Sequence, residues 1–231
     1  MSGGGSPKGL YRASGISLIL IAVVVAISTV IAFATPSTPF SPEKALTSYP
    51  SQAALFFATN AMGVLIGVLG FVGVVGLYAS LRETNPGFSL VGTVFGAAAF
   101  TVTLVSTAMT LATPALYDSY ASSAATAGDK AAFVAAYETI SQASSAIGGV
   151  SFVLLGVFAL IVSWVMLKGV FSKGVAYLGF AVFVVVSVLV ASGPFPAAGF
   201  VGFIGYVALV VLIAAFSAAV GVKLFRLGSA K

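Results

Sequence analysis

Six long apolar runs, separated by short polar segments, form the main pattern of the chain. The clearest run, residues 53–81, contains no charged residue and ends abruptly at Arg82 and Glu83. A helix of roughly 20 apolar residues crosses a bilayer core about 30 Å thick, so this run is long enough to span it. We predict an all-α polytopic membrane bundle of six spanning helices. The predicted spans cover residues 15–34, 53–81, 88–113, 146–167, 174–191 and 197–222.

The two ends of the chain are more polar than the runs between them. Residues 1–14 are interpreted as a flexible cytoplasmic tail and residues 227–231 as a second cytoplasmic tail, around a single domain of residues 15–226. The first apolar run ends in an Ala-Phe-Ala sequence of the kind that a signal peptidase cleaves. Because this run is longer than the roughly 7–15 residues of a signal-peptide core, we expect a retained spanning helix.

Prolines predict where the helices stop. Four of them fall between residues 35 and 52: Pro36, Pro39, Pro42 and Pro50. Proline lacks a backbone donor and its ring disrupts a helix interior, so this segment is predicted to be an extended loop. The polar turn of residues 82–87 is likewise expected to end the second span, with the break at Pro86.

The longest polar segment, residues 114–145, is predicted to begin as a loop and continue as a helix. Asp129 is suited to cap a helix that begins at Lys130. The apolar side chains that then share one helical face are Phe133, Tyr137, Ile140 and Ile147. We predict a short amphipathic helix in this third loop, at the outer surface of the membrane.

The composition excludes a soluble fold and a nucleic-acid partner. Only 6% of the 231 residues are charged and the mean hydropathy is +1.16, whereas about 25% of the residues of a soluble globular protein are charged. The net charge of +5 comes from ten basic residues spread singly between apolar runs. They cannot form the basic patch that binds nucleic acid. The expected surroundings of the chain are the lipid bilayer.

The basic residues predict the orientation. If six spans alternate across the membrane, one side holds Lys8, Arg12, Arg82, Lys168, Lys173, Lys223, Arg226 and Lys231. The other side holds only Lys44 and Lys130. Because basic residues resist translocation, we predict that both termini are cytoplasmic and that the protein resides in the cell membrane.

Glycines recur at helical spacing within several spans, where they favour close packing of helices. The candidate packing positions are Gly63, Gly67, Gly70, Gly92, Gly96, Gly199 and Gly202. A bundle of six helices does not need all of these surfaces internally. We therefore expect some of them to face a membrane-protein partner or a second copy of the chain.

Few polar side chains and no charged ones fall within the predicted spans. Asn60, Thr101 and Thr103 are the candidates for a hydrated path, together with Glu138 if the amphipathic helix reaches an outer vestibule. Each also has a structural interpretation, which we favour. Asparagine bonds neighbouring helices, threonine bonds its own backbone, and Glu138 belongs to a solvated face.

The chain lacks most of the residues on which enzyme and metal sites depend. It has neither cysteine nor histidine, which removes thiolate chemistry, imidazole-bound haem and most zinc sites. The glycine-rich residues 199–205 lack the Lys-Ser/Thr of a phosphate-binding loop. We expect no catalytic residue, no metal and no cofactor.

Two stretches resemble a known family type. They are VLIGVLGFVGVVGLYASLRETNP, from Val64 to Pro86, and VLLGVFALIVSWVMLKGVFSKGVAYLGF, from Val153 to Phe180. In the second, a helix ends in a basic turn and a further helix follows. The order of features resembles six-span integral membrane proteins of bacteria and archaea that are grouped as domains of unknown function. The resemblance implies a six-helix bundle and no established activity, so it assigns no functional residue.

Three functions are weighed on this basis. We expect a non-catalytic accessory or scaffold subunit that associates with other membrane proteins or with itself. The alternative is a transporter or channel for a small neutral or weakly polar solute, built on Asn60 and the threonines of the third span. An enzyme is the third, with Glu138 and Asp118 as its only candidate acids.

Overall fold

The computed structural model describes residues 8–34, 41–122, 124–191 and 200–230. Within these ranges the secondary structure is helical. The helices are α1 (Lys8–Ala34), α2 (Pro42–Leu81), α3 (Pro86–Thr110), α4 (Thr113–Ala121), α5 (Ala127–Met166), α6 (Lys173–Ala191) and α7 (Phe200–Ser229). Six spans in this part of the chain are long and apolar enough to cross a membrane, with α4 continuing from α3. The all-α class and the six spans are confirmed.

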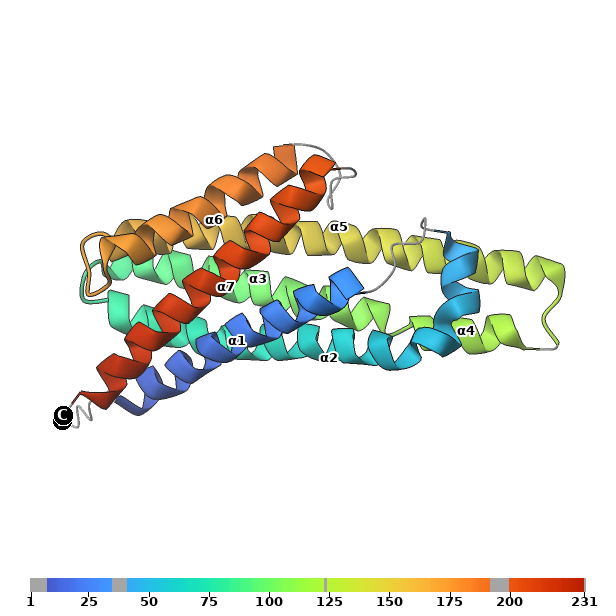
Figure 1. The fold of residues 1–231 in the computed structure, drawn as a ribbon, viewed down its shortest axis with the longest axis horizontal. Helices are drawn as coiled ribbons and strands as arrows, with labels where there is room; N and C mark the ends of the chain where they lie inside the picture. Colours follow the sequence, from blue (N-terminus) through green and yellow to red (C-terminus); the bar gives the residue numbers. More distant parts are fainter. Residues whose placement is uncertain (1–7, 35–40, 123, 192–199, 231) are drawn as a thin grey trace.

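The six spanning helices form a closed ring. Each packs against its neighbours in the order α1, α2, α3, α5, α6 and α7, and α7 returns to α1. We call the end of the ring where Lys8 and Ser229 lie the basal end, and the opposite end the distal end. In Figure 1 the basal end is on the left, and α1 and α7 cross the other helices obliquely.

Helices α1 and α7 are in contact at the basal end and separate distally. A Cβ atom at Gly15 would lie 2.7 Å from the Gly221 carbonyl oxygen, so the two backbones touch there. Farther along, the Ser28 hydroxyl of α1 contacts the Met62 sulfur of α2 at 3.1 Å, while Gly205 of α7 lies against Leu189 of α6. Figure 1 shows the resulting divergence of α1 from α7.

Two helices are much longer than a membrane is thick. At about 1.5 Å per residue, the 19 residues of α6 are about 28 Å long. The 40 residues of α2 and of α5 are about 60 Å long by the same measure. Their surplus, together with α4, projects beyond the other spans (Figure 1). We call residues 42–52, 113–121 and 127–145 the distal extension.

The prediction of an extended loop over residues 35–52 is wrong for its second half. Ser41 caps α2 by accepting a hydrogen bond from the Lys44 backbone N–H, and Pro42 occupies the first turn, where proline is tolerated. Pro50 lies inside α2. It removes one backbone hydrogen bond, and Figure 1 shows the first turns of α2 at a steep angle to the rest. Pro36 and Pro39 fall outside the described residues.

Pro86 begins a helix rather than breaking one. The Asn85 side chain accepts a hydrogen bond from the Phe88 backbone N–H at 3.1 Å, and Pro86 is the first residue of α3. Its fixed backbone suits that position. The second span ends at Leu81, as the pattern predicts.

The expected tails are helical over residues 8–14 and 227–229. Helix α1 begins at Lys8, and Ser14 is fully buried with its hydroxyl donating to the Val72 carbonyl at 2.7 Å. Helix α7 continues to Ser229, where the Arg12 side chain donates to the Gly228 carbonyl at 3.0 Å. Both ends extend the bundle because these polar groups find partners on neighbouring helices. Residues 1–7 and 231 fall outside the described part.

The third loop also differs from its prediction. Residues 113–121 form α4, and the amphipathic residues 127–145 are the first half of the continuous helix α5 rather than a separate short helix. The cap is Thr126, which shares reciprocal hydrogen bonds with Asp129. Asp129 therefore completes a capping box and is not itself the capping residue.

Candidate functional site

The main cavity of the described structure lies inside the helix ring. Its volume is about 320 Å³, and every spanning helix contributes to its wall. This is at the lower end of the roughly 300–1,000 Å³ found for small-molecule sites. A cavity shared by six helices is suited to bind one small molecule.

The two halves of this cavity differ in polarity. The basal half is formed mainly by hydrocarbon, such as Leu18, Phe158 and Phe216. The distal half carries the hydroxyl groups of Ser28, Thr29, Thr103, Ser106, Thr107, Ser151 and Tyr206. No charged side chain or amide belongs to the described wall. The site therefore offers hydroxyls and hydrocarbon only.

Contacts between neighbouring helices show which residues lie at the basal level of the cavity and which lie at the distal level. At the basal level, Leu18 of α1 lies beside Gly73 of α2, and Phe216 of α7 lies beside Gly179 of α6. At the distal level, Thr107 of α3 lies beside Gly63 of α2. The polar residues of α1, α3 and α5 that line the cavity thus lie at its distal level.

Most distal hydroxyls are bonded to backbone. Ser28 and Thr29 each donate to the carbonyl four residues earlier, both at 2.8 Å. Thr107 does the same to Thr103 at 3.0 Å. Such back-bonding uses the one hydrogen of each hydroxyl. These oxygens can still accept a hydrogen bond from a ligand.

Two hydroxyl clusters join α3 to α5 at the cavity wall. The Thr103 and Ser151 hydroxyl oxygens lie 2.7 Å apart, and both approach the Ala99 carbonyl, at 3.0 and 2.8 Å. One turn farther, Ser106 donates to the Ser144 carbonyl at 3.0 Å and Ser144 donates to the Ser106 carbonyl at 3.1 Å. Between helices in lipid, such bonds are worth about 0.6–2 kcal/mol. They hold this wall in place.

Among the hydroxyl-bearing residues of the cavity wall, Ser217 and Tyr206 differ from those described above because their hydroxyls make no hydrogen bond in the described structure. Ser217 is only 8% exposed and lines the cavity, yet it has no hydrogen-bond partner among the described residues. Tyr206 also lines the cavity, and its hydroxyl lacks a partner in the same part of the chain. Both groups are free to bond a ligand.

The structure separates the four residues predicted for a polar path. Thr103 lines the cavity, whereas Thr101 is exposed and donates to the Ala97 carbonyl at 2.9 Å. Asn60 is half-buried away from the cavity wall; it bonds Thr110 of α3 and donates to the Phe56 carbonyl at 2.8 Å.

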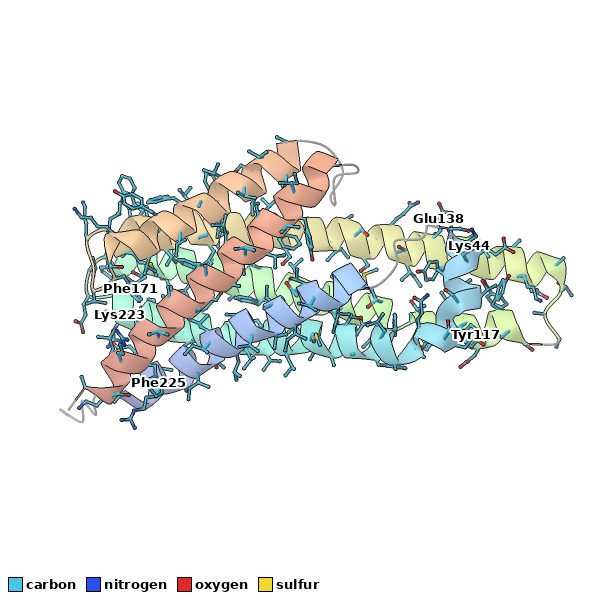
Figure 2. The ribbon with its side chains drawn as sticks, in the orientation of Figure 1. Lys44, Tyr117, Glu138, Phe171, Lys223 and Phe225 are labelled. Carbon is cyan, nitrogen blue, oxygen red and sulfur yellow. The ribbon has the colours of Figure 1, made fainter. Side chains whose placement is uncertain are left out.

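Glu138 lies in the distal extension, away from the cavity. It is exposed and accepts a hydrogen bond from Gln142 at 3.1 Å. Figure 2 shows it at the distal end with Lys44 and Tyr117, far from Lys223 and Phe225 at the basal end. The four predicted residues therefore do not form one path.

The predicted packing glycines lie against helices of the same chain. Cβ atoms at Gly63, Gly67 and Gly70 of α2 would meet α3 side chains at 2.8, 2.5 and 2.3 Å. Those at Gly92 and Gly96 of α3 would meet α5 at 3.1 and 2.8 Å. Gly199 falls outside the described residues, and Gly202 is described only by its place in α7.

The polar stripe predicted for the third span includes the cavity residues Ser106 and Thr107, but sequence reasoning missed the serines of the other spans. Ser151 and Ser217 are isolated serines in two different spans, and Ser28 and Thr29 are adjacent in a third. Their only signal is polarity inside an apolar run, which many lipid-facing serines share. It is the order of the helices in the ring that brings them to one cavity.

Within the described ranges, the acidic residues form no group of three that could hold a metal ion. Comparison of the chain with protein-family models, with curated proteins and with solved structures found no match. The resemblance to six-span membrane proteins stays a prediction, and the cavity is interpreted from its own geometry.

Proposed function

We propose that this multi-pass membrane protein binds a small, uncharged, weakly polar molecule within its helix ring. The observation that carries the proposal is the cavity of about 320 Å³ to which all six spans contribute. The function is that of a membrane transporter or carrier for such a solute.

The cavity volume sets the size of the solute. An engineered apolar cavity of roughly 150 Å³ binds benzene, which has six non-hydrogen atoms. By proportion, a cavity of about 320 Å³ holds about a dozen such atoms. This corresponds to a medium-length hydrocarbon chain or a small terpenoid rather than a membrane phospholipid.

The chemistry of the wall sets the charge of the solute. A charged group enclosed by hydrocarbon without a partner of opposite charge is strongly destabilised. The described wall supplies hydroxyls and no ionised side chain. A neutral molecule with a hydroxyl or carbonyl group fits this wall, and a carboxylate or ammonium compound does not.

The geometry favours a carrier over a channel. A channel requires a continuous path for its solute. The basal half of this cavity is hydrocarbon, and below it the backbones of α1 and α7 touch at Gly15 and Gly221. In the distal half α1 diverges from α7 (Figure 1), so this backbone contact does not continue along the full length of the two helices.

The orientation follows from the basic residues. The described ones at the basal end are Lys8, Arg12, Arg82, Lys168, Lys173, Lys223 and Arg226. Lys44 and Lys130 are at the distal end. Because basic residues are retained on the cytoplasmic side, we propose that the basal end faces the cytoplasm of a cell whose plasma membrane holds the protein.

A second candidate is an accessory subunit. The glycines that suggested it lie against helices of the same chain, so its support is now the distal extension, which stands clear of α1, α6 and α7 (Figure 1). Covalent cross-linking in intact membranes tests it. A reproducible cross-link from the extension to one other protein, or to a second copy, would favour this candidate.

Native mass spectrometry with added 1-decanol tests the binding proposal. Val25 lines the cavity, whereas Val23 is 49% exposed on the outer face of the same helix. Val25→Trp is expected to abolish the decanol adduct, and Val23→Trp to leave it unchanged. Ile213→Trp fills the same cavity from α7 and serves if Val25→Trp does not fold. Equal adducts in all four proteins would overturn the proposal.

A further inference from the structure

The two unpartnered hydroxyls of α7 lie on one face of the helix, at different heights in the cavity. Tyr206 and Ser217 are 11 residues apart, which is about three full turns of a helix. Both therefore face the same side, about 16 Å apart along the helix axis. Both belong to the cavity wall.

The other cavity hydroxyls do not share this property. Those of α1 and α3 that back-bond have already used their hydrogen. An exposed serine does so as well; Ser187 of α6 donates to the Phe183 carbonyl at 2.9 Å. Ser217 is buried and makes no such bond in the described structure. Its hydrogen is available inside the cavity.

We infer that the ligand is an uncharged chain molecule that carries two oxygen groups and is held at both ends. One oxygen bonds the Tyr206 hydroxyl in the distal, hydroxyl-rich half, and the other bonds Ser217 in the basal half. The hydrocarbon between them contacts residues such as Leu18, Phe158 and Phe216. This inference rests on the proposed function and names the class of its solute.

The basal half of the cavity determines the preference for a ligand with a second oxygen group. Ser217 is the single hydroxyl among the described wall residues at that height, and its surroundings are hydrocarbon. A ligand with one oxygen satisfies Tyr206 and leaves Ser217 without a partner. A ligand with two satisfies both, and an added neutral hydrogen bond is worth about fivefold to tenfold in affinity.

The test compares three compounds with the same number of carbons: dodecane, 1-dodecanol and 1,12-dodecanediol. Adduct formation is measured by native mass spectrometry over a concentration series, and diols of eight and sixteen carbons give the preferred length. We expect affinity to rise about fivefold to tenfold at each added hydroxyl. Dodecanediol and dodecanol binding equally well to the unmodified protein would overturn the inference.

Two substitutions locate the contacts. Ser217→Ala is expected to remove the advantage of the diol over the alcohol, and Ser217→Thr, which keeps a hydroxyl, to retain it. Tyr206→Phe is expected to lower the affinity for both compounds. Ser119→Ala of α4 and Tyr177→Phe of α6 are matched controls, because both side chains are exposed and line no cavity in the described structure, and they are expected to change nothing.

The outcomes separate this inference from the proposed function. If all three compounds bind equally and Val25→Trp abolishes their binding, the cavity binds solutes but Ser217 is not a ligand contact. The same conclusion follows if Ser217→Ala keeps the full preference for the diol. If no compound binds the unmodified protein, both this inference and the proposed function fail.

Discussion

Gly15 and Gly221 meet backbone to backbone where the first and last helices cross. A Cβ atom at Gly15 would lie 2.7 Å from the Gly221 carbonyl oxygen, and one at Gly221 would lie 2.8 Å from the Gly15 carbonyl oxygen. This contact closes the ring at its basal end and fixes where α1 and α7 begin to separate.

The contact predicts that neither glycine tolerates a methyl group. A backbone atom cannot move aside as a flexible side chain can, so Gly15→Ala and Gly221→Ala should each destabilise the fold by about 3 kcal/mol. Thermal unfolding in mild detergent, followed by the fluorescence of Trp164, measures the effect. Gly9→Ala is the control, since nothing lies within 4 Å of its Cβ position; similar losses at all three sites would contradict the crossing.

The reciprocal serine pair of α3 and α5 predicts an energetic coupling. Besides donating to backbone carbonyls, the Ser106 and Ser144 hydroxyl oxygens lie 3.1 Å apart. Each substitution to alanine therefore removes the hydroxyl partner of the other serine, and the double substitution should cost less than the sum of the single ones. The expected coupling is about 0.6 kcal/mol, up to about 1.7. A double-mutant cycle measures it. The effects of Ser106→Ala and Ser187→Ala should be additive, because the exposed Ser187 makes no bond to Ser106. A coupling of zero for Ser106 and Ser144 would refute the pair.

Asn60 is predicted to serve stability and not ligand binding. Its side chain bonds Thr110 and the Phe56 carbonyl, away from the cavity wall. Asn60→Leu should lower the unfolding free energy by about 1 kcal/mol and leave the decanol adduct unchanged. Thr110→Val should give the same pattern. Loss of binding in a variant of unchanged stability would instead make Asn60 a solute contact.

The start of α5 depends on its capping box. Thr126→Ala removes the acceptor for the Asp129 backbone N–H. The free energy needed to open the first turns of α5 should therefore fall by about 1 kcal/mol. Hydrogen exchange of peptides from residues 127–137 measures the change. Ser119→Ala in α4 is the control, because that hydroxyl is exposed and only back-bonds. Equal exchange in the two variants would count against the cap.

Cysteine labelling tests the proposed orientation. The sequence contains no cysteine, so Ser119→Cys and Ser229→Cys each introduce a single thiol. A membrane-impermeant maleimide added to intact cells should label position 119, in the distal extension, and not position 229 until the cells are lysed. The reverse pattern would place the basal end outside.

The spans were predictable from sequence because membrane thickness dictates their length. Uninterrupted apolar runs of about 20 residues are typical of helices that cross a bilayer. Helix starts were less well predicted, since proline was interpreted only as a breaker. A capping residue followed by proline is also typical of a helix start. Ser41 and Asn85 are such caps, and Pro42 and Pro86 are the first residues of α2 and α3. The sequence already contained this signal.

The cavity was much less predictable. Thr101 and Thr103 were assigned to one polar path, but positions two apart differ by about 200° around a helix, so only one of them reaches the cavity wall. Ser187 and Ser217 are equally isolated serines in apolar helices. One faces outward and the other inward because of the order of helices in the ring, which no local pattern encodes.

The most direct test of the central claim is an electron cryo-microscopy map of the protein purified from membranes with a bound antibody fragment. We expect elongated density inside the ring, from the level of Tyr206 to that of Ser217, which disappears in Val25→Trp. A cavity filled by side chains, with α1 and α7 packed together along their whole length, would contradict it.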